Sequence, residues 1–253
     1  VVIADGQLDG VVSPATNVSF FGATGVTLVL PFTILTTFTL NDGSTVDIDI
    51  VGELTSSSYS SEVAVADITS VIIGENVTSI GIFAFGHATS LTAISIPASV
   101  ISIGDVVFMG ATSLASITFG ANSQLTSIGD AAFHNASSLT QVIIPTSVTS
   151  IGGNAFNGAS SLTSVTFEEN SQLTSIGQSV FNATSLTSII IPATVTIIGY
   201  NAFYEVTSLT SITFEENSQL TSIGQSVFNG ASSLTSINMP ASLTSIEEAV
   251  FTV

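Results

Sequence analysis

The sequence predicts a repeat solenoid built mainly from β-strands. Landmark residues recur every 23–25 positions from Ile68 onward, and each repeat contains a stretch in which apolar and polar residues alternate. One stretch occurs almost unchanged twice: SLTSVTFEENSQLTSIGQSVFN at Ser161–Asn182 returns at Ser208–Asn229, with only Val165 replaced by Ile212. Because a single unit of this size cannot bury its own apolar face, neighbouring units must stack.

Three apolar landmarks define each of eight units. The first is a Leu or Ile: Ile68, Leu91, Leu114, Leu139, Leu162, Leu186, Leu209 and Leu234. The second is an Ile that precedes Gly in every unit but the last: Ile80, Ile103, Ile128, Ile151, Ile176, Ile198, Ile223 and Ile246. The third is a Phe: Phe85, Phe108, Phe133, Phe156, Phe181, Phe203, Phe228 and Phe251. Stacking aligns these residues, so we expect a core of Leu, Ile and Phe columns.

The elements of one unit follow from its local pattern. In LTSITF, Ile212 and Phe214 alternate with polar neighbours, which predicts a first strand. In LTSIG, Leu220 and Ile223 point inward and the Gly permits a sharp corner after a second strand. QSVFNGAS is too short for a regular helix, so we expect a helical or 3₁₀ turn that places its Phe in the core.

Short and long units alternate. Short units contain an Ile-Pro or Met-Pro pair, at Pro97, Pro145, Pro192 and Pro240. Long units carry a two-residue insertion within FGANSQL or FEENSQL. The duplicated block is therefore a pair of units that spans 47 or 48 residues.

The repeated pattern LTSI.IP.SVTSIG..AF.GAS, across Ile68–Val253, resembles the BspA-like leucine-rich repeat family. The resemblance is specific because Leu, Ile, Pro, Ile-Gly and Ala-Phe recur in register. It implies a curved parallel solenoid, a secreted or cell-surface location, and roles in adhesion and protein binding. It implies no catalytic site and no cofactor. We therefore assign residues 66–253 to a leucine-rich-repeat solenoid of eight units.

Residues 1–65 do not repeat and are predicted to form a β-rich N-terminal module. Asn-Asp-Gly lies between two alternating runs in Thr37–Ile50, which indicates a β-hairpin. TNVSFFGATGVTLVLPFTIL predicts one or two further strands. The module either caps the open end of the solenoid or docks another chain.

Composition excludes several functions. The chain has no Lys or Arg and a formal net charge of −18, although only 7 % of its residues are charged, against about 25 % in ordinary domains. Without basic side chains we expect no binding to nucleic acid or to anionic lipid. Schiff-base chemistry and a phosphate-binding P-loop also need Lys. No apolar run reaches the roughly 20 residues that span a bilayer, so we expect no membrane insertion.

Candidate sites in the repeats have simple alternative explanations. His87, His134 and Asp130 invite comparison with a catalytic triad, yet nothing in the sequence fixes their geometry, and solvated turn residues explain them better. Two acidic pairs occupy equivalent positions two units apart and are weak calcium candidates: Glu168, Glu169, Glu215 and Glu216. Four sequons provide candidate glycosylation acceptors in a eukaryotic secretory route: Asn17, Asn76, Asn135 and Asn182.

The outward residues of the first strand, those of the second strand and the C-terminal end are three candidate interaction surfaces. The outward residues of the first strand are mostly Ser, Thr and Ile without aromatic or Arg anchors, which argues against tight recognition there. A Thr column on the second strand is typical both of this repeat and of ice-binding solenoids. The last unit ends near Val250, Phe251 and Val253 with no polar capping unit, so we expect this end to self-associate or to continue in a longer protein.

Two hypotheses of function follow. The first is a non-enzymatic extracellular structural or adhesive protein that self-assembles head to tail into a surface fibre. The alternative is a ligand-binding module of a larger surface adhesin or receptor. Val1 in place of Met fits a mature secreted form, and the partner is either a second copy of the chain or another surface protein.

Overall fold

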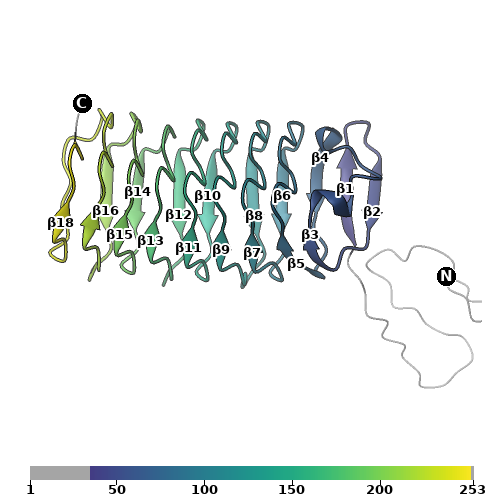
Figure 1. The fold of residues 1–253 in the computed structure, drawn as a ribbon, viewed down its shortest axis with the longest axis horizontal. Helices are drawn as coiled ribbons and strands as arrows, with labels where there is room; N and C mark the ends of the chain where they lie inside the picture. Colours follow the sequence, from purple (N-terminus) through teal and green to yellow (C-terminus); the bar gives the residue numbers. More distant parts are fainter. Residues whose placement is uncertain (1–34, 252–253) are drawn as a thin grey trace, which may run out of the picture.

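The computed structural model describes residues 35–251. Coils of chain stack one on another along the long axis of the molecule, from the N-terminal hairpin to the last unit (Figure 1). Each coil is one sequence unit, so the predicted mainly-β repeat solenoid is confirmed. Asn17, Val253 and the strands predicted within TNVSFFGATGVTLVLPFTIL before Leu35 lie outside the described residues.

Each of the first seven units contributes a first strand and a second strand. The first strands, here called the first-strand series, are β4 (Ile68–Ile72), β6 (Ala93–Ile96), β8 (Ser116–Phe119), β10 (Gln141–Ile144), β12 (Ser164–Phe167), β14 (Ser188–Ile191) and β16 (Ser211–Phe214). The corresponding segment of the eighth unit, residues 234–239, is not a strand.

The second strands form one continuous parallel sheet of nine strands, here called the second-strand sheet. Its members are β3 (Gly52–Leu54), β5 (Val77–Ile80), β7 (Ser102–Ile103), β9 (Ser127–Ile128), β11 (Ser150–Ile151), β13 (Ser175–Ile176), β15 (Ile197–Ile198), β17 (Ser222–Ile223) and β18 (Ser245–Ile246). Strand β3 precedes residue 66, so the predicted N-terminal module shares this sheet with the repeats.

Threonine side chains reinforce the second-strand sheet. Each hydroxyl donates to the main-chain carbonyl of the matching residue in the preceding unit, at 3.0–3.2 Å. The donors are Thr126, Thr149, Thr174, Thr196, Thr221 and Thr244. These hydroxyl protons are used inside the molecule, which gives the predicted Thr column a structural role.

The glycines that follow the second strands permit close stacking. A Cβ on Gly129 would lie 2.5 Å from the carbonyl carbon of Gly104, and a Cβ on Gly224 would lie 2.8 Å from the backbone nitrogen of Tyr200. Real Cβ atoms do not approach backbone so closely. Close approach between neighbouring units, rather than a sharp corner alone, therefore explains the Ile-Gly repeat.

The segment around each Phe forms turns and not the helical or 3₁₀ turn expected from the sequence. Each of these turns contains left-handed residues, such as Val106 (φ 52°) and Gly110 (φ 69°), which prevent a helix from forming. The freed main-chain groups bond to the next unit instead: the N–H of Val106 donates to Asp130 O, and that of Phe108 donates to Ala132 O. The turns of neighbouring units are thus joined by their own series of main-chain hydrogen bonds.

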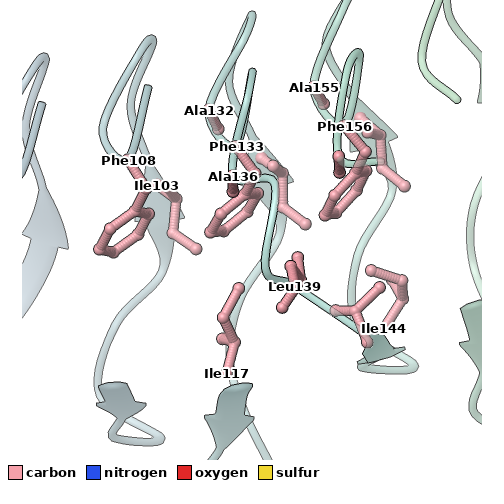
Figure 2. Packing of buried hydrophobic residues seen from close by; sticks show 14 of the residues in the cluster. Ile103, Phe108, Ile117, Ala132, Phe133, Ala136, Leu139, Ile144, Ala155 and Phe156 are labelled. Carbon is pink, nitrogen blue, oxygen red and sulfur yellow. The ribbon is translucent and has the colours of Figure 1, made fainter. Parts of the chain in front are cut away.

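The core is one continuous cluster of Leu, Ile, Val, Ala and Phe side chains. Phe108, Phe133 and Phe156 stack with ring centroids 5.1 Å apart (Figure 2). Similar contacts continue the aromatic column to Phe251. The predicted Leu, Ile and Phe columns are present.

The N-terminal hairpin covers the first coil. Strand β1 (Thr36–Leu40) pairs antiparallel with β2 (Thr45–Ile48) and with β4, which confirms the hairpin predicted from Asn-Asp-Gly. In its turn, hydrogen bonds from the hydroxyl and the N–H of Ser44 lower the pKa of Asp42. The 3₁₀ helices Ser56–Ser58 and Val65–Asp67 lead into the repeats.

The aromatic column begins within this N-terminal part. Tyr59 is buried, with its ring between those of Phe38 and Phe85, at centroid distances of 4.8 and 5.8 Å. Its hydroxyl donates to the carbonyl of Ala84. Burial raises the pKa of Tyr59 well above its ordinary value. Residues 35–65 therefore pack against the first unit, and the assignment of residues 1–65 as a cap or a docking module stays a prediction.

Candidate functional site

The first-strand series is interrupted at regular positions. Strands β6 and β8, β10 and β12, and β14 and β16 pair in parallel over four residues each. We call each of these pairs a strand doublet. Between residues 35 and 251, no such pairing joins β8 to β10 or β12 to β14. Each doublet is a short unit followed by a long unit, so the duplicated block seen in the sequence is also a unit of strand pairing.

Main-chain hydrogen bonds are longer between doublets than within them. Within doublets, the N–H groups of Thr163 and Thr210 donate to the preceding unit at 3.0 and 2.9 Å. The equivalent bonds across the boundaries, from Thr140 and Thr187, lengthen to 3.5 and 3.4 Å. The hydroxyls of Thr163 and Thr210 also donate to the preceding unit. The two long bonds are therefore close to the limit of a hydrogen bond.

Proline explains where the strands separate. After a strand of a long unit, Glu168 N–H donates to Ile144 O at 3.0 Å. Pro145 and Pro192 occupy the equivalent position in short units and have no N–H to donate. Proline alone is not sufficient, because Pro97 follows β6, which remains paired with β4 over three residues. The interrupted steps also follow long units, whose first strands end in Phe.

A hollow lies at each interrupted step. The hollow between β8 and β10 has a volume of about 250 Å³ and is lined by Ser116, Ile117, Thr118, Phe119, Gln141, Val142, Ile143 and Glu168. The hollow between β12 and β14 has a volume of about 200 Å³ and is lined by Ser164, Val165, Thr166, Phe167, Ser188, Ile189, Ile190 and Glu215. The two linings match position by position, two units apart.

An isoleucine and a glutamate border each hollow. Ile143 and Ile190 are 55 % and 58 % exposed. Glu168 accepts hydrogen bonds from the N–H and hydroxyl of Thr146, and Glu215 accepts one from Ala193 N–H. Each site thus combines an apolar wall with a solvent-exposed carboxylate.

The glutamates have a structural explanation as turn acceptors. Each accepts the N–H of the residue after Pro145 or Pro192, and no Lys or Arg exists in the chain to pair with them. Among residues 35–251, no group of three or more His, Cys, Asp or Glu side chains is placed to hold a metal ion. The calcium hypothesis for Glu168, Glu169, Glu215 and Glu216 stays a prediction.

The residues considered for catalysis do not form a relay in the described coils. Asp130 accepts the N–H of Gly153 at 2.7 Å. His134 Nε2 lies 3.1 Å from the side-chain amide of Asn135, and its Nδ1 is buried with no partner between residues 35 and 251. The ring of His87 packs edge-on against Phe83. Turn packing accounts for these residues.

The remaining sequence candidates fall on turns and on the last coil. Asn135 is exposed, whereas Asn76 and Asn182 are half-buried, and glycosylation at any of them stays a prediction. Val250 is buried, but Phe251 is 51 % exposed although it stacks on Phe228. Ile246 is 52 % exposed, whereas the matching Ile223 is fully buried. Within the last described coil, Ile246 and Phe251 are therefore less covered than their counterparts in earlier units.

The two hollows were missed from the sequence. The outward residues of the first strands include Ile143 and Ile190, but their sequence column contains no aromatic or Arg anchor. The signal in the sequence is a Pro directly after the first strand of the units that follow a long unit, at Pro145 and Pro192.

Comparison with known proteins agrees with the architecture. The family model described as BspA type Leucine rich repeat region matches residues 59–173 and 126–253, in six copies. The structure of the pneumococcal vaccine antigen PcpA is 25 % identical, with a TM-score of 0.50, over 60 % of this chain and 52 % of PcpA. The chain thus spans about half the length of PcpA.

A second similar structure is the leucine-rich repeat protein of T. pallidum. It is 25 % identical, with a TM-score of 0.52, over 66 % of this chain and 78 % of the other. Curated protein sequences give no match. Over the described residues, the structure contains no helix that is long and apolar enough to cross a membrane.

Proposed function

The chain belongs to the BspA-type leucine-rich repeat family, and from this membership we propose that it is a non-enzymatic, adhesive protein-binding module that acts outside the cell. The single observation that carries the proposal is the pair of matching hollows beside the exposed Ile143 and Ile190. Exposed aliphatic side chains beside a recess are typical of interaction surfaces. The similarity to a bacterial vaccine antigen supports a location at the cell surface.

The proposal favours the second of the two sequence-based hypotheses for the repeat surface. Thr hydroxyls bond to the preceding unit in both series, and Ile197 of the second-strand sheet is 48 % exposed, but Ile143 and Ile190 each border a hollow between unpaired strands. A partner that covers Ile143 and Ile190 buries apolar area, which favours binding by roughly 25 cal/mol per Å² before the costs of association. The first-strand series is therefore the proposed binding face.

A masking experiment tests the binding face. The chain contains no Cys, so one introduced Cys can be labelled without side reactions. A polymer attached through Thr166→Cys would cover the hollow between β12 and β14, whereas one attached through Ile197→Cys would cover the second-strand sheet. Beads that carry each protein would be tested for adhesion to a panel of purified extracellular proteins. We expect adhesion to be lost only with the Thr166→Cys conjugate; loss only with Ile197→Cys would refute the assignment.

A second proposal is head-to-tail self-association through the last described coil. Ile246 and Phe251 offer a strand edge and an aromatic ring on which a further coil could stack, as Phe251 itself stacks on Phe228. A second copy of the chain is the partner named by the fibre hypothesis. Sedimentation across a concentration series tests it: we expect larger species that disappear with Phe251→Ser. A monomer at all concentrations would remove this proposal without affecting the binding face.

A further inference from the structure

We propose that the two hollows together bind a polyproline II segment that repeats one aliphatic and one basic residue at every third position. The inference rests on the proposed function, because it names the partner class of the same face. It adds three properties that the partner must have: a period of three residues, an apolar anchor in each period, and a positive charge in each period.

The size of each hollow suits one aliphatic side chain. The volumes are about 250 and 200 Å³. An apolar protein cavity of about 150 Å³ is sufficient to hold benzene, so a Leu, Ile or Val side chain fits in either hollow. Thr118 and Phe119 form one wall of the first hollow, and Val142 and Ile143 form the other. The same residue types line the second hollow, so both hollows should select the same side chain.

The distance between the hollows sets the period of the ligand. They are two units apart, with paired strands β10 and β12 between them, and a rise of about 5 Å per unit separates their centres by about 10–11 Å. The aromatic column shows a similar rise, with ring centroids 5.1 Å apart from Phe133 to Phe156 and 5.8 Å apart from Phe156 to Phe181. A ligand must therefore present matching side chains at roughly this interval.

A polyproline II helix meets that requirement. It has three residues per turn and a rise of about 3.1 Å per residue, so every third side chain lies on the same face about 9.3 Å further along. A β-strand also covers about 10 Å in three residues, but its residues i and i+3 point to opposite faces. Polyproline II is also ordered before binding, which reduces the entropic cost.

Charge indicates the second side chain of each period. Glu168 and Glu215 border the two hollows at equivalent positions, and both are exposed. Their hydrogen bonds come from Thr146 and Ala193, which are uncharged. Because the whole chain has no Lys or Arg, a basic side chain from a partner meets attraction at both sites and no competing cation.

A designed peptide tests the inference on the full chain. The probe is a peptide of four Pro-Leu-Arg triplets. One control has the same residues in scrambled order, which keeps the charge but removes the period, and the other replaces Arg by Glu. Titration calorimetry would measure the affinity of the full chain for each of the three peptides. We expect the triplet peptide to bind roughly tenfold more tightly than the scrambled peptide. Equal binding of the two basic peptides, or no binding of either, overturns the inference.

Matched variants show whether both hollows contribute. We expect Ile143→Ser and Ile190→Ser each to lower the affinity for the triplet peptide by roughly tenfold, which is the usual effect of removing aliphatic contact from a pocket. Ile72→Ser is the control, because Ile72 is 60 % exposed in the same column but lines neither hollow. An equal loss with Ile72→Ser contradicts the assignment. Circular dichroism spectra confirm that each variant is folded.

The result is separable from the test of the proposed function. If both basic peptides bind equally and the Thr166→Cys conjugate blocks both, the binding face stands and the three-residue period is wrong. If the peptides do not bind but the polymer at Thr166→Cys still abolishes adhesion to proteins, the binding face again stands and the polyproline partner is wrong. If adhesion is insensitive to masking at Thr166, the proposed binding face itself fails.

Discussion

The second-strand sheet and the first-strand series are built from the same units, yet only the sheet is continuous. The sheet runs unbroken from β3 to β18, although most of its strands are only two residues long. The first strands are mostly four residues long, yet the series is interrupted at Pro145 and Pro192, so β4, β6 and β8 stay in one sheet while β10 with β12 and β14 with β16 form separate pairs. Strand length therefore does not decide continuity.

The difference separates stability from recognition. In the second-strand sheet, Gly129 and its equivalents allow close stacking, and Thr hydroxyls add a bond at each step from β7 to β18. In the first-strand series, the interruptions leave hollows and exposed isoleucines. One side of each coil holds the stack together, and the other side carries the proposed binding face.

The largest expected effect comes from breaking the close stacking. Gly129→Ala places a Cβ 2.5 Å from the carbonyl carbon of Gly104, so backbone must move, at a cost of about 1–3 kcal/mol or more. Gly153→Ala is the control, because its nearest neighbour would be Gln178 O at an ordinary 3.5 Å. Urea unfolding should show a lower midpoint for Gly129→Ala alone. Equal midpoints for the two variants would contradict the role given to close stacking.

Alkaline pH tests whether the stack truly begins before Ile68. Because the pKa of buried Tyr59 is raised, the folded state holds its proton where the unfolded chain releases it. The stabilising contribution is complete below about pH 10 and decreases by about 1.4 kcal/mol for each pH unit above it. Urea midpoints at pH 8 and pH 11 should therefore fall more in the unmodified protein than in Tyr59→Phe. The same fall in both would show that Tyr59 is not buried.

The Thr ladder predicts a smaller, position-specific effect. Thr149→Val removes the hydroxyl that donates to Thr126 O and should cost about 1 kcal/mol. Thr140→Val should have almost no effect, because among the described residues the Thr140 hydroxyl makes no hydrogen bond at its doublet boundary. Thermal unfolding of the two variants measures the difference. A larger loss with Thr140→Val would reverse the comparison between the two series.

The smallest effect on stability is expected from restoring a donor at a boundary. Pro145→Ala supplies an N–H opposite Phe119 O, and a hydrogen bond between them would stabilise the folded state by about 1 kcal/mol. The same change raises the conformational entropy of the unfolded chain, which lowers the free energy of unfolding by about 0.4–1 kcal/mol. Stability should hardly change, whereas amide exchange at Thr140 should slow as the strands pair. Pro97→Ala is the control, because β4 and β6 are already paired. Unchanged exchange at Thr140 would show that proline is not the cause of the break.

Much of the fold was predictable because periodicity fixes which side chains stack. The Phe column, the second strands, the hairpin that turns at Gly43 and the two-unit block all follow from the sequence pattern. The turns around each Phe were not predicted, because left-handed residues such as Val106 have no distinctive sequence signal. The hollows were not predicted either, since they depend on a missing hydrogen bond at Pro145 and a neighbouring Phe119, a combination visible only across two units.

Amide hydrogen exchange at four matched threonines shows directly whether the first-strand series is interrupted where the second-strand sheet is continuous. Thr163 and Thr210 donate within doublets at 3.0 and 2.9 Å, whereas Thr140 and Thr187 donate across boundaries at 3.5 and 3.4 Å. The account predicts that Thr140 and Thr187 exchange much faster than Thr163 and Thr210 in the native protein. Equal protection of all four amides would mean that the first-strand series is as continuous as the second-strand sheet, and would contradict the account.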